Sequence, residues 1–229
     1  MLASFNGSST GAFPVAGVIL SGSTLYGTTP LGGANGAGEV YSVPVTGGTP
    51  TVLASFNGTS NGSEPYAGLI LSGSTLFGTT LEGGAYGDGE VFSLPVTGGT
   101  PTVLASFDMS DGQDPTSALT LSGDTLFGTT ENGGQYGYGE VFSVPIAGGD
   151  PNVLASFDIS DGDYPYAGLI MDATGNLYGT TIYGGTNGRY GTVFELSTVP
   201  EPTSTCLIGL GCIVLLSRSA WRGKRKIHC

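Results

Sequence analysis

The chain has 229 residues, among them 42 Gly and 13 Pro, and its formal net charge is −12. Gly and Pro at this density interrupt long helical patterns, because Gly loses entropy in a helix and Pro lacks a backbone donor. Residues 1–200 carry 17 acids and one base, so this part of the chain repels the phosphates of nucleic acids, and we expect no nucleic-acid partner.

One sequence unit occurs four times. Its Thr-Leu-aromatic-Gly-Thr-Thr motif, which has Asn176 in place of the first Thr in the last copy, contains an aromatic residue that recurs at Tyr26, Phe77, Phe127 and Tyr178. A second marker, Leu-Ala-Ser-Phe, begins at Leu2, Leu53, Leu104 and Leu154. Both markers keep steps of 50 or 51 residues. This period and the short β-branched and aromatic runs predict an all-β fold, with one blade of a β-propeller in each unit.

Each unit offers four strands, which in the second unit are residues 67–71, 75–79, 90–95 and 102–107. Short Gly-containing loops join the first pair and the last pair, and they predict hairpins. The Gly-rich segment 81–89 between the second and third strands predicts an exposed loop. We expect the aromatic residues of the motif to form core layers. Glu39, Glu90 and Glu140, which recur at the start of the third strand, are predicted to fill a structural position.

The strands missing at the two ends of the array complement each other. The chain begins with a fourth-strand sequence at Leu2, and the last unit stops after its third strand. We therefore predict a four-bladed propeller in which the N-terminal strand completes the last blade and removes its free edge. Met1 occupies the position of Val52, so a longer gene product with a leader and further blades is the open alternative.

Two loops after the fourth strands are rich in Asp. Their carboxylates are Asp108, Asp111, Asp114, Asp158, Asp161 and Asp163. Oxygen-rich loops with a Gly turn suit Ca²⁺, although these loops lack the spacing and the bidentate Glu of an EF-hand. Asp beside Gly is also an ordinary turn former, and we expect no cofactor other than this candidate calcium. Five Tyr residues in the long loops are candidates for stacking on a glycan: Tyr86, Tyr136, Tyr138, Tyr183 and Tyr190.

The C-terminal tail has a different character. All Cys residues and the lone His228 lie there, so residues 1–198 have no thiol nucleophile, His base or His metal ligand. The tail contains a Pro-Glu-Pro motif, a short apolar segment over residues 206–216 and a basic end. Its motif and basic residues are Val199, Pro200, Glu201, Pro202, Arg218, Arg222, Lys224, Arg225 and Lys226. Lys and Arg after an apolar segment hold that end in the cytoplasm, which predicts a short hydrophobic transmembrane helix.

These features carry two resemblances. Residues 199–229 resemble a PEP-CTERM sorting signal. This resemblance implies export across the inner membrane of a Gram-negative bacterium, recognition by an exosortase and removal of the tail near the Pro-Glu-Pro motif. Residues 2–197 resemble the GloVer tandem repeat of choice-of-anchor surface proteins, best in the copy from Gly175 to Phe194. That resemblance implies a cell-surface setting and leaves the chemistry open.

The sequence therefore predicts a repeat domain over residues 1–198 and a sorting signal over residues 199–229. We expect an exported, exosortase-processed surface or extracellular matrix protein that acts as a non-catalytic binding or structural propeller. Extracellular polysaccharide is the expected partner. The alternative is a carbohydrate-active enzyme, a glycosidase or lyase, that uses Asp and Glu on the loop face. Near-identical units favour the first hypothesis, because a catalytic site usually needs one blade to differ.

Overall fold

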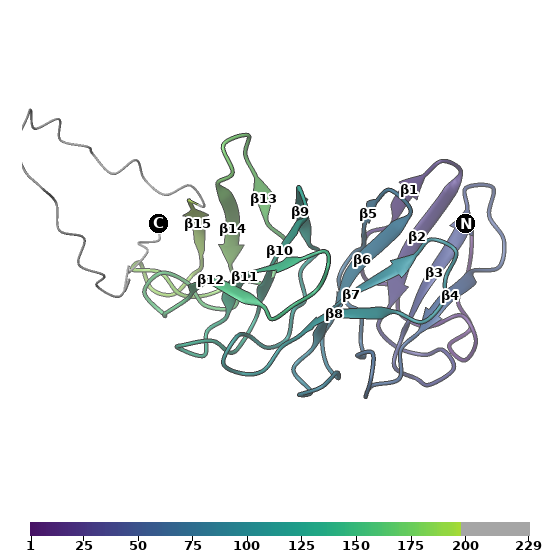
Figure 1. Ribbon diagram of the computed structural model, residues 1–229, viewed down its shortest axis with the longest axis horizontal. Helices are drawn as coiled ribbons and strands as arrows, with labels where there is room; N and C mark the ends of the chain where they lie inside the picture. Colours follow the sequence, from purple (N-terminus) through teal and green to yellow (C-terminus); the bar gives the residue numbers. More distant parts are fainter. Residues whose placement is uncertain (198–229) are drawn as a thin grey trace, which may run out of the picture.

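The computed structural model describes residues 1–197 (Figure 1). Within this range the chain forms strands and loops without a helix, as the composition predicts. No helix long and apolar enough to cross a membrane is found among residues 1–197. The predicted C-terminal helix and the residues of the sorting signal lie outside the described residues.

The strands form four antiparallel sheets in chain order. Sheet 1 contains β1 (Ile19–Ser21), β2 (Thr24–Thr29), β3 (Glu39–Pro44) and β4 (Thr51–Ser55). Sheet 2 contains β5 (Ile70–Ser72), β6 (Thr75–Thr80), β7 (Glu90–Pro95) and β8 (Thr102–Ser106). Sheet 3 contains β9 (Thr120–Ser122), β10 (Thr125–Thr130), β11 (Glu140–Pro145) and β12 (Asn152–Ser156). Sheet 4 contains β13 (Ile170–Met171), β14 (Leu177–Thr181) and β15 (Thr192–Leu196). Sheets 1 to 3 are the predicted four-stranded, propeller-like meander, and sheet 4 follows the same order with three strands within residues 1–197.

The Gly-Thr-Thr motif is explained by its position between two sheets. Gly78 lies opposite Phe92 in the β6–β7 ladder, and a Cβ at Gly78 would stand 2.8 Å from Cζ of the Phe92 ring. Only Gly therefore leaves room for the aromatic residue of the next strand. The first Thr of the motif connects neighbouring sheets, since the Thr79 hydroxyl donates to the carbonyl oxygen of Pro115 over 2.9 Å.

Three apolar clusters fill the spaces between consecutive sheets. In β6, Leu76 packs in the cluster that faces sheet 1, whereas Phe77 packs in the cluster that faces sheet 3. This alternation follows from the two-residue period of a strand. Aromatic pairs in edge-to-face geometry join the sheets, and Phe107 meets Phe142 with 4.8 Å between ring centroids. The prediction that the motif aromatics form core layers is confirmed at Tyr26 and Phe77.

The N-terminal segment does not complete the last sheet, in contrast to the closure that the sequence predicts. Residues 2–5 lie against sheet 1, where the Leu2 carbonyl accepts the Gly48 N–H over 2.9 Å and Phe5 meets Tyr41 edge to face. In Figure 1 sheets 1 and 4 lie at opposite ends of a row of sheets. The first and the last sheet therefore do not meet. Sheet 4 has three strands within residues 1–197.

Candidate binding site

Two loops of each unit meet at one end of its sheet, and together these paired loops form what we call the rim. One loop follows a fourth strand, and the other joins the second and third strands of the next sheet. In sheet 2 the backbones of Ser63 and Glu82 exchange hydrogen bonds of 2.8 and 3.2 Å. Equivalent bridges pair Ala12 with Leu31, Gln113 with Asn132 and Asp163 with Tyr183. The rim thus repeats one arrangement of loops at four stations.

The predicted calcium ligands all lie in this rim, and hydrogen bonds hold most of them as follows. The Asp108 carboxylate accepts the backbone N–H and the hydroxyl of Ser110. The Ser110 hydroxyl holds the pKa of Asp108 below its usual value. The Asp111 carboxylate accepts the Asp108 N–H over 2.9 Å, while burial raises the pKa of Asp111. Asp158 and Asp161 repeat both contacts in the next unit.

The remaining two Asp residues have other partners. The Asp114 carboxylate accepts the Asn132 amide over 2.8 Å, and Asp163 forms an ion pair with Arg189 over 3.0 Å. Within residues 1–197, no group of three or more His, Cys, Asp or Glu side chains has an arrangement that could hold a metal ion. Calcium binding by these loops stays an alternative to the plain turn.

The second unit closes the corresponding loop, which is one residue longer, with neutral residues. The Asn61 side chain accepts the Asn57 N–H over 2.8 Å, and the Asn57 side chain accepts the Ser60 N–H over 2.9 Å. Side chains of Asn and Asp are equally suited to such turns, because both offer an oxygen to nearby backbone donors. A charged carboxylate is therefore not needed to shape this loop.

The recurring Glu residues are buried under the Gly pair of the long loop, as the prediction of a structural position requires. Glu140 is 1% exposed, and its Oε1 accepts the Ser156 hydroxyl over 2.6 Å. Burial raises the pKa of Glu140. Its Oε2 and the Thr130 hydroxyl are buried without a hydrogen-bond partner in the described part of the chain. Glu39 and Glu90 share this environment.

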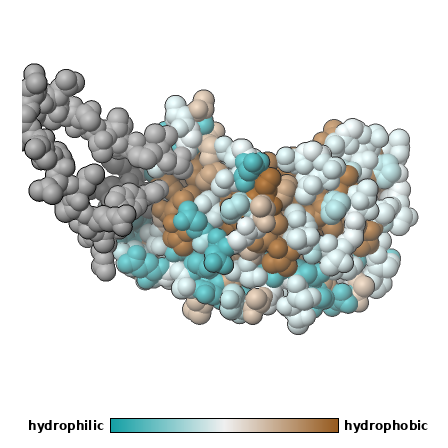
Figure 2. All heavy atoms as spheres, viewed as in Figure 1, coloured by the Kyte–Doolittle hydropathy of each residue, from teal (hydrophilic) through white to brown (hydrophobic). Residues whose placement is uncertain are grey.

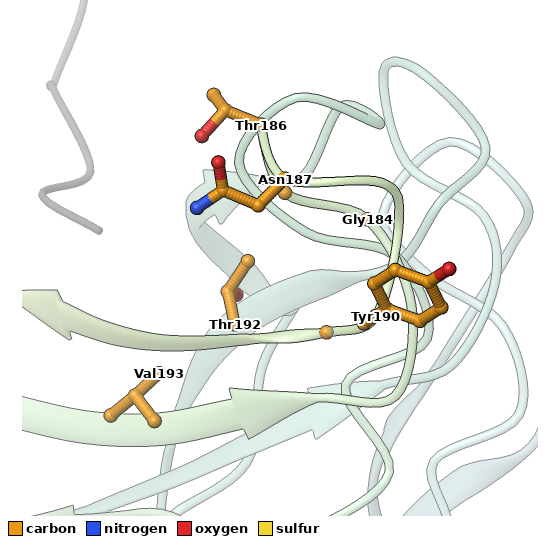
Figure 3. A pocket seen from close by; sticks show the side chains of 8 residues that line it. Gly184, Thr186, Asn187, Tyr190, Thr192 and Val193 are labelled. Atoms are coloured by element: carbon orange, nitrogen blue, oxygen red, sulfur yellow. The ribbon is translucent and has the colours of Figure 1, made fainter.

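The fourth unit differs, because Thr192 stands where the other units have Glu. A Cβ at Gly134 would meet the Glu140 carboxylate, whereas a Cβ at Gly185 meets the Thr192 methyl group at 3.0 Å. A hollow of about 340 Å³ lies beside Thr192. In Figure 3, Asn187 and Thr192 lie on opposite sides of this hollow and the ring of Tyr190 lies at its end. The lining residues are all neutral.

Four of the five predicted Tyr residues are exposed on the rim. Tyr86 and Tyr136 occupy equivalent positions one unit apart, and they are 67% and 51% exposed. Tyr190 is 90% exposed beside the hollow, and Tyr183 is 50% exposed. Tyr138 is the exception, because it packs against the cluster between sheets 3 and 4. Sequence reasoning did not identify the hollow, although the change from Glu to Thr192 was a visible signal.

A group of acids gathers where sheets 2 and 3 meet at the rim. Asp88 accepts a hydrogen bond from Gln113 over 2.9 Å. Burial raises the pKa of Asp88, and the negative charges of Asp114 and Asp108 raise it further. The pKa of Asp108 moves in the opposite direction. Two carboxyl groups whose pKa values move apart are a feature of acid and base pairs in active sites.

Comparison with known families gives two matches. The model of the Gloeobacter/Verrucomicrobia repeat matches residues 1–194. The model of the PEP-CTERM protein-sorting motif matches residues 198–226. The second match indicates an exosortase-sorted protein with a cell-envelope or extracellular location in a Gram-negative bacterium.

Among solved structures, the chain is similar to a TolB-type protein from Agrobacterium tumefaciens, with 13% identity and a TM-score of 0.49 over 76% of this chain and 57% of that one. It is also similar to a europium-containing methanol dehydrogenase, with 20% identity and a TM-score of 0.47 over 72% of this chain and 28% of that one. A gluconolactonase from Xanthomonas campestris matches with 16% identity and a TM-score of 0.44, over 75% of this chain and 64% of that one. The search of curated proteins found no match. The chain thus spans less than two thirds of each of these solved structures.

Proposed function

The chain belongs to the Gloeobacter/Verrucomicrobia repeat family and carries a PEP-CTERM sorting motif, and from this premise we propose that it is a non-catalytic surface protein that binds extracellular polysaccharide through its rim. The observation that carries the proposal is the row of exposed Tyr side chains on successive rim loops. Tyr offers a large apolar ring and a polar tip, and it loses little conformational entropy when it binds.

The hollow beside Tyr190 supports the same function. Its lining includes the hydroxyl of Thr186 and the amide of Asn187, which can exchange hydrogen bonds with sugar hydroxyls. A concave site with an aromatic ring and a few polar groups is the usual form of a small-ligand site. Because residues 1–197 carry an excess of acids, a neutral polysaccharide suits this rim better than an acidic one.

A binding measurement with dextran as a neutral polysaccharide and hyaluronan as an acidic one tests the proposal. The full-length chain in mild detergent is expected to be retarded in a gel that contains dextran, and less so in a gel that contains hyaluronan. Tyr190→Ala should weaken the binding about tenfold, a loss of about 1.4 kcal/mol. Val45→Ala is the matched control, since Val45 is exposed on a hairpin at the other end of sheet 1.

Multivalency gives a second readout. Tyr86 and Tyr136 belong to separate rim stations, so a long glycan can contact both while a short oligosaccharide contacts one. Replacing both with Ala is therefore expected to reduce binding of long dextran more than binding of a short gluco-oligosaccharide. Equal losses for the two lengths, or no retardation by any of these glycans, would contradict the proposal.

The acids around Asp88 favour a second candidate, a glycosidase in which one carboxyl acts as general acid and another as base. Release of new reducing ends from a polysaccharide, lost in Asp88→Asn, would favour this candidate. We expect no such release. The binding function requires that Asp88→Asn leave the retardation in dextran unchanged.

The tail is proposed to anchor the chain in the inner membrane through the apolar segment 206–216 until an exosortase cuts near Pro200. The order of the Pro-Glu-Pro motif, apolar segment and basic end supports this step. Mass spectrometry of the protein released by its native host should find a C-terminus close to residues 199–202. A released protein that still ends at Cys229 would contradict the anchoring step.

A further inference from the structure

Every internal junction between sheets has the same aromatic contact, and two of the three junctions also share a backbone hydrogen bond. The Leu of a fourth strand accepts a hydrogen bond from a Gly in the next sheet, as between Leu53 and Gly99, and the distance is 2.9 Å at both junctions where this bond is found. The Phe that follows that strand then meets an aromatic ring of the next sheet, as Phe56 meets Phe92 with 5.1 Å between centroids. A fourth strand therefore pairs with its own sheet and docks onto the next one.

Residues 2–5 dock onto sheet 1 as a fourth strand docks onto the next sheet, but in the described part of the chain they do not pair with a sheet of their own. Leu2 bonds to Gly48 over 2.9 Å, and Phe5 meets Tyr41 with 4.8 Å between centroids. These contacts reproduce the docking of a fourth strand onto the next sheet. Within residues 1–197 this segment belongs to no sheet of its own. It is positioned as the fourth strand of a sheet that would precede sheet 1.

Sheet 4 lacks a fourth strand within residues 1–197. Its edge strand β15 has no neighbour beyond it in the described part of the chain. Val193 in β15 is 70% exposed, whereas its counterparts Val40, Val91 and Val141 are fully buried. Ile170 in β13 is likewise 70% exposed. Figure 2 shows apolar side chains at the surface in this part of the molecule. This face is the one that sheets 1 to 3 bury against the next sheet.

The outward face of sheet 1 shows the same exposure at the other end. Leu20 is 63% exposed and Val18 is 49% exposed, whereas Leu69, the counterpart of Val18 in sheet 2, is 3% exposed. The exposed face of sheet 4 and the outward face of sheet 1 thus correspond to the two surfaces that meet at each internal junction. Each is apolar, and each matches a surface that the chain already buries three times.

We propose that copies of this chain associate head to tail, with residues 2–5 of one copy pairing as the fourth strand of sheet 4 in the next. Sheet 1 of the first copy then packs on the exposed face of sheet 4. The register follows from sheet 1, where Val40 lies opposite Ala54 and Glu39 lies opposite Ser55. It places Ala3 opposite Val193, and Ser4 opposite Thr192. Such a contact joins different surfaces, so it produces either a closed ring or an open chain.

The charge of the molecule sets the conditions under which association is strongest. Residues 1–197 have 17 acids and one base, so two copies repel each other over long distances. Salt screens this repulsion and also strengthens apolar burial when the salt is a sulfate. Association is therefore expected to increase from low salt to about 0.15 M salt, at which the screening length is about 8 Å.

Analytical ultracentrifugation of the full-length chain in mild detergent tests the proposal. Species of twice the chain mass or more are expected. Val193→Glu should weaken association at least tenfold, because it places a charge in the junction without disturbing the buried core of one copy. Met109→Glu is the matched control, since Met109 is 66% exposed on a rim loop outside the junction. A monomer at every concentration would overturn the proposal, as would an oligomer that Val193→Glu leaves unchanged.

Disulfide trapping tests the register. One copy carries Ser4→Cys and the other carries Thr192→Cys, and the native Cys206, Cys212 and Cys229 are replaced by Ser in both. Directly opposed residues in an antiparallel pair are close enough for a disulfide. Mixing the two variants under oxidising conditions should give a covalent dimer. Ser74→Cys replaces Ser4→Cys in the control mixture. Equal yields in the two mixtures would show that the strand pairing is wrong, because Ser74 lies on a hairpin of sheet 2.

Discussion

At the scale of single residues, the Gly of the Gly-Thr-Thr motif is required by the aromatic ring beside it. A Cβ at Gly128 would stand 2.6 Å from Cζ of Phe142, which packs between two sheets and is fully buried. Such contacts force side chains or backbone to move. The motif that defines the repeat in the sequence is therefore a packing motif.

Gly128→Ala is expected to lower the free energy of unfolding by about 1–3 kcal/mol, the usual cost of overpacking a core. Gly17→Ala is the control, because no atom lies within 4 Å of a Cβ at Gly17. Chemical denaturation of the two variants measures the difference. Equal midpoints would show that the core around Phe142 adapts to the added methyl group.

The buried Glu residues couple stability to pH. Burial raises the pKa of Glu39, Glu90 and Glu140 above the ordinary value of 4.5. The folded state therefore binds these protons more tightly than the unfolded state. This contribution to stability is fully present below the unfolded pKa and is lost as the pH rises through the folded pKa.

We accordingly expect the thermal midpoint to rise when the pH is lowered from 7 to about 5. The triple variant Glu39→Gln, Glu90→Gln, Glu140→Gln should show a flatter dependence, because Gln keeps the shape and does not titrate. Calorimetry across this pH range makes the comparison, with the exposed Asp124→Asn as control. If the thermal midpoint of the triple variant changes with pH as steeply as that of the original chain, other groups cause the pH dependence.

At the scale of elements, each junction between sheets rests on an edge-to-face aromatic pair. Phe107 is fully buried against Phe142, whereas Phe5 makes the same contact with Tyr41 and stays partly exposed. Both Phe residues follow a Leu-Ala-Ser sequence. The difference between them is the presence or absence of a neighbouring sheet.

Phe107→Ala is expected to cost about 3–5 kcal/mol of unfolding free energy, because it leaves a cavity in a closed core. Phe5→Ala should cost roughly 1 kcal/mol, because less apolar area leaves the solvent at this site. Urea denaturation at low protein concentration, where copies do not associate, gives both values. A loss at Phe5 as large as that at Phe107 would mean that residues 2–5 are buried more fully than this structure shows.

Strand positions could be predicted well from the sequence, and the rim less well. The motif around Phe77 and the hairpin loops locate β6, β7 and β8 to within one residue. The first strand begins at Ile70 rather than at residue 67, because the Ala67 carbonyl accepts the Thr28 hydroxyl of the preceding sheet instead of a ladder bond. Tyr138 was placed in an exposed loop because its packing partners come from another sheet and leave no local pattern.

At the scale of the whole molecule, the sequence period defines the unit but not the angle between units. The matching deficits at Leu2 and after β15 predicted a closed ring of four blades. Closure depends on the rotation from each sheet to the next, which arises from the shapes of side chains across three interfaces and has no signature in a single repeat. The fold class was accessible from pattern, whereas the arrangement of the ends was not.

Thermal unfolding with and without a chelator tests the role of the Asp loops in the whole molecule. We expect the thermal midpoint to be unchanged by EDTA or by added Ca²⁺, since local donors already hold the carboxylates of Asp108 and Asp111 by hydrogen bonds. A ligand that binds only the folded state would raise the midpoint by mass action. A midpoint that EDTA lowers and Ca²⁺ restores would instead establish the loops as cation sites.

The repetition of one junction has a consequence for how such genes change. A fourth strand such as β8 docks onto the next sheet, and the aromatic pair of this contact recurs at every boundary between described sheets. Duplication or deletion of a segment of about 50 residues, wherever in the unit the breakpoints fall, would therefore recreate the same contacts at the new boundary. Unequal recombination can change the length of the array by whole sheets while each remaining interface stays intact.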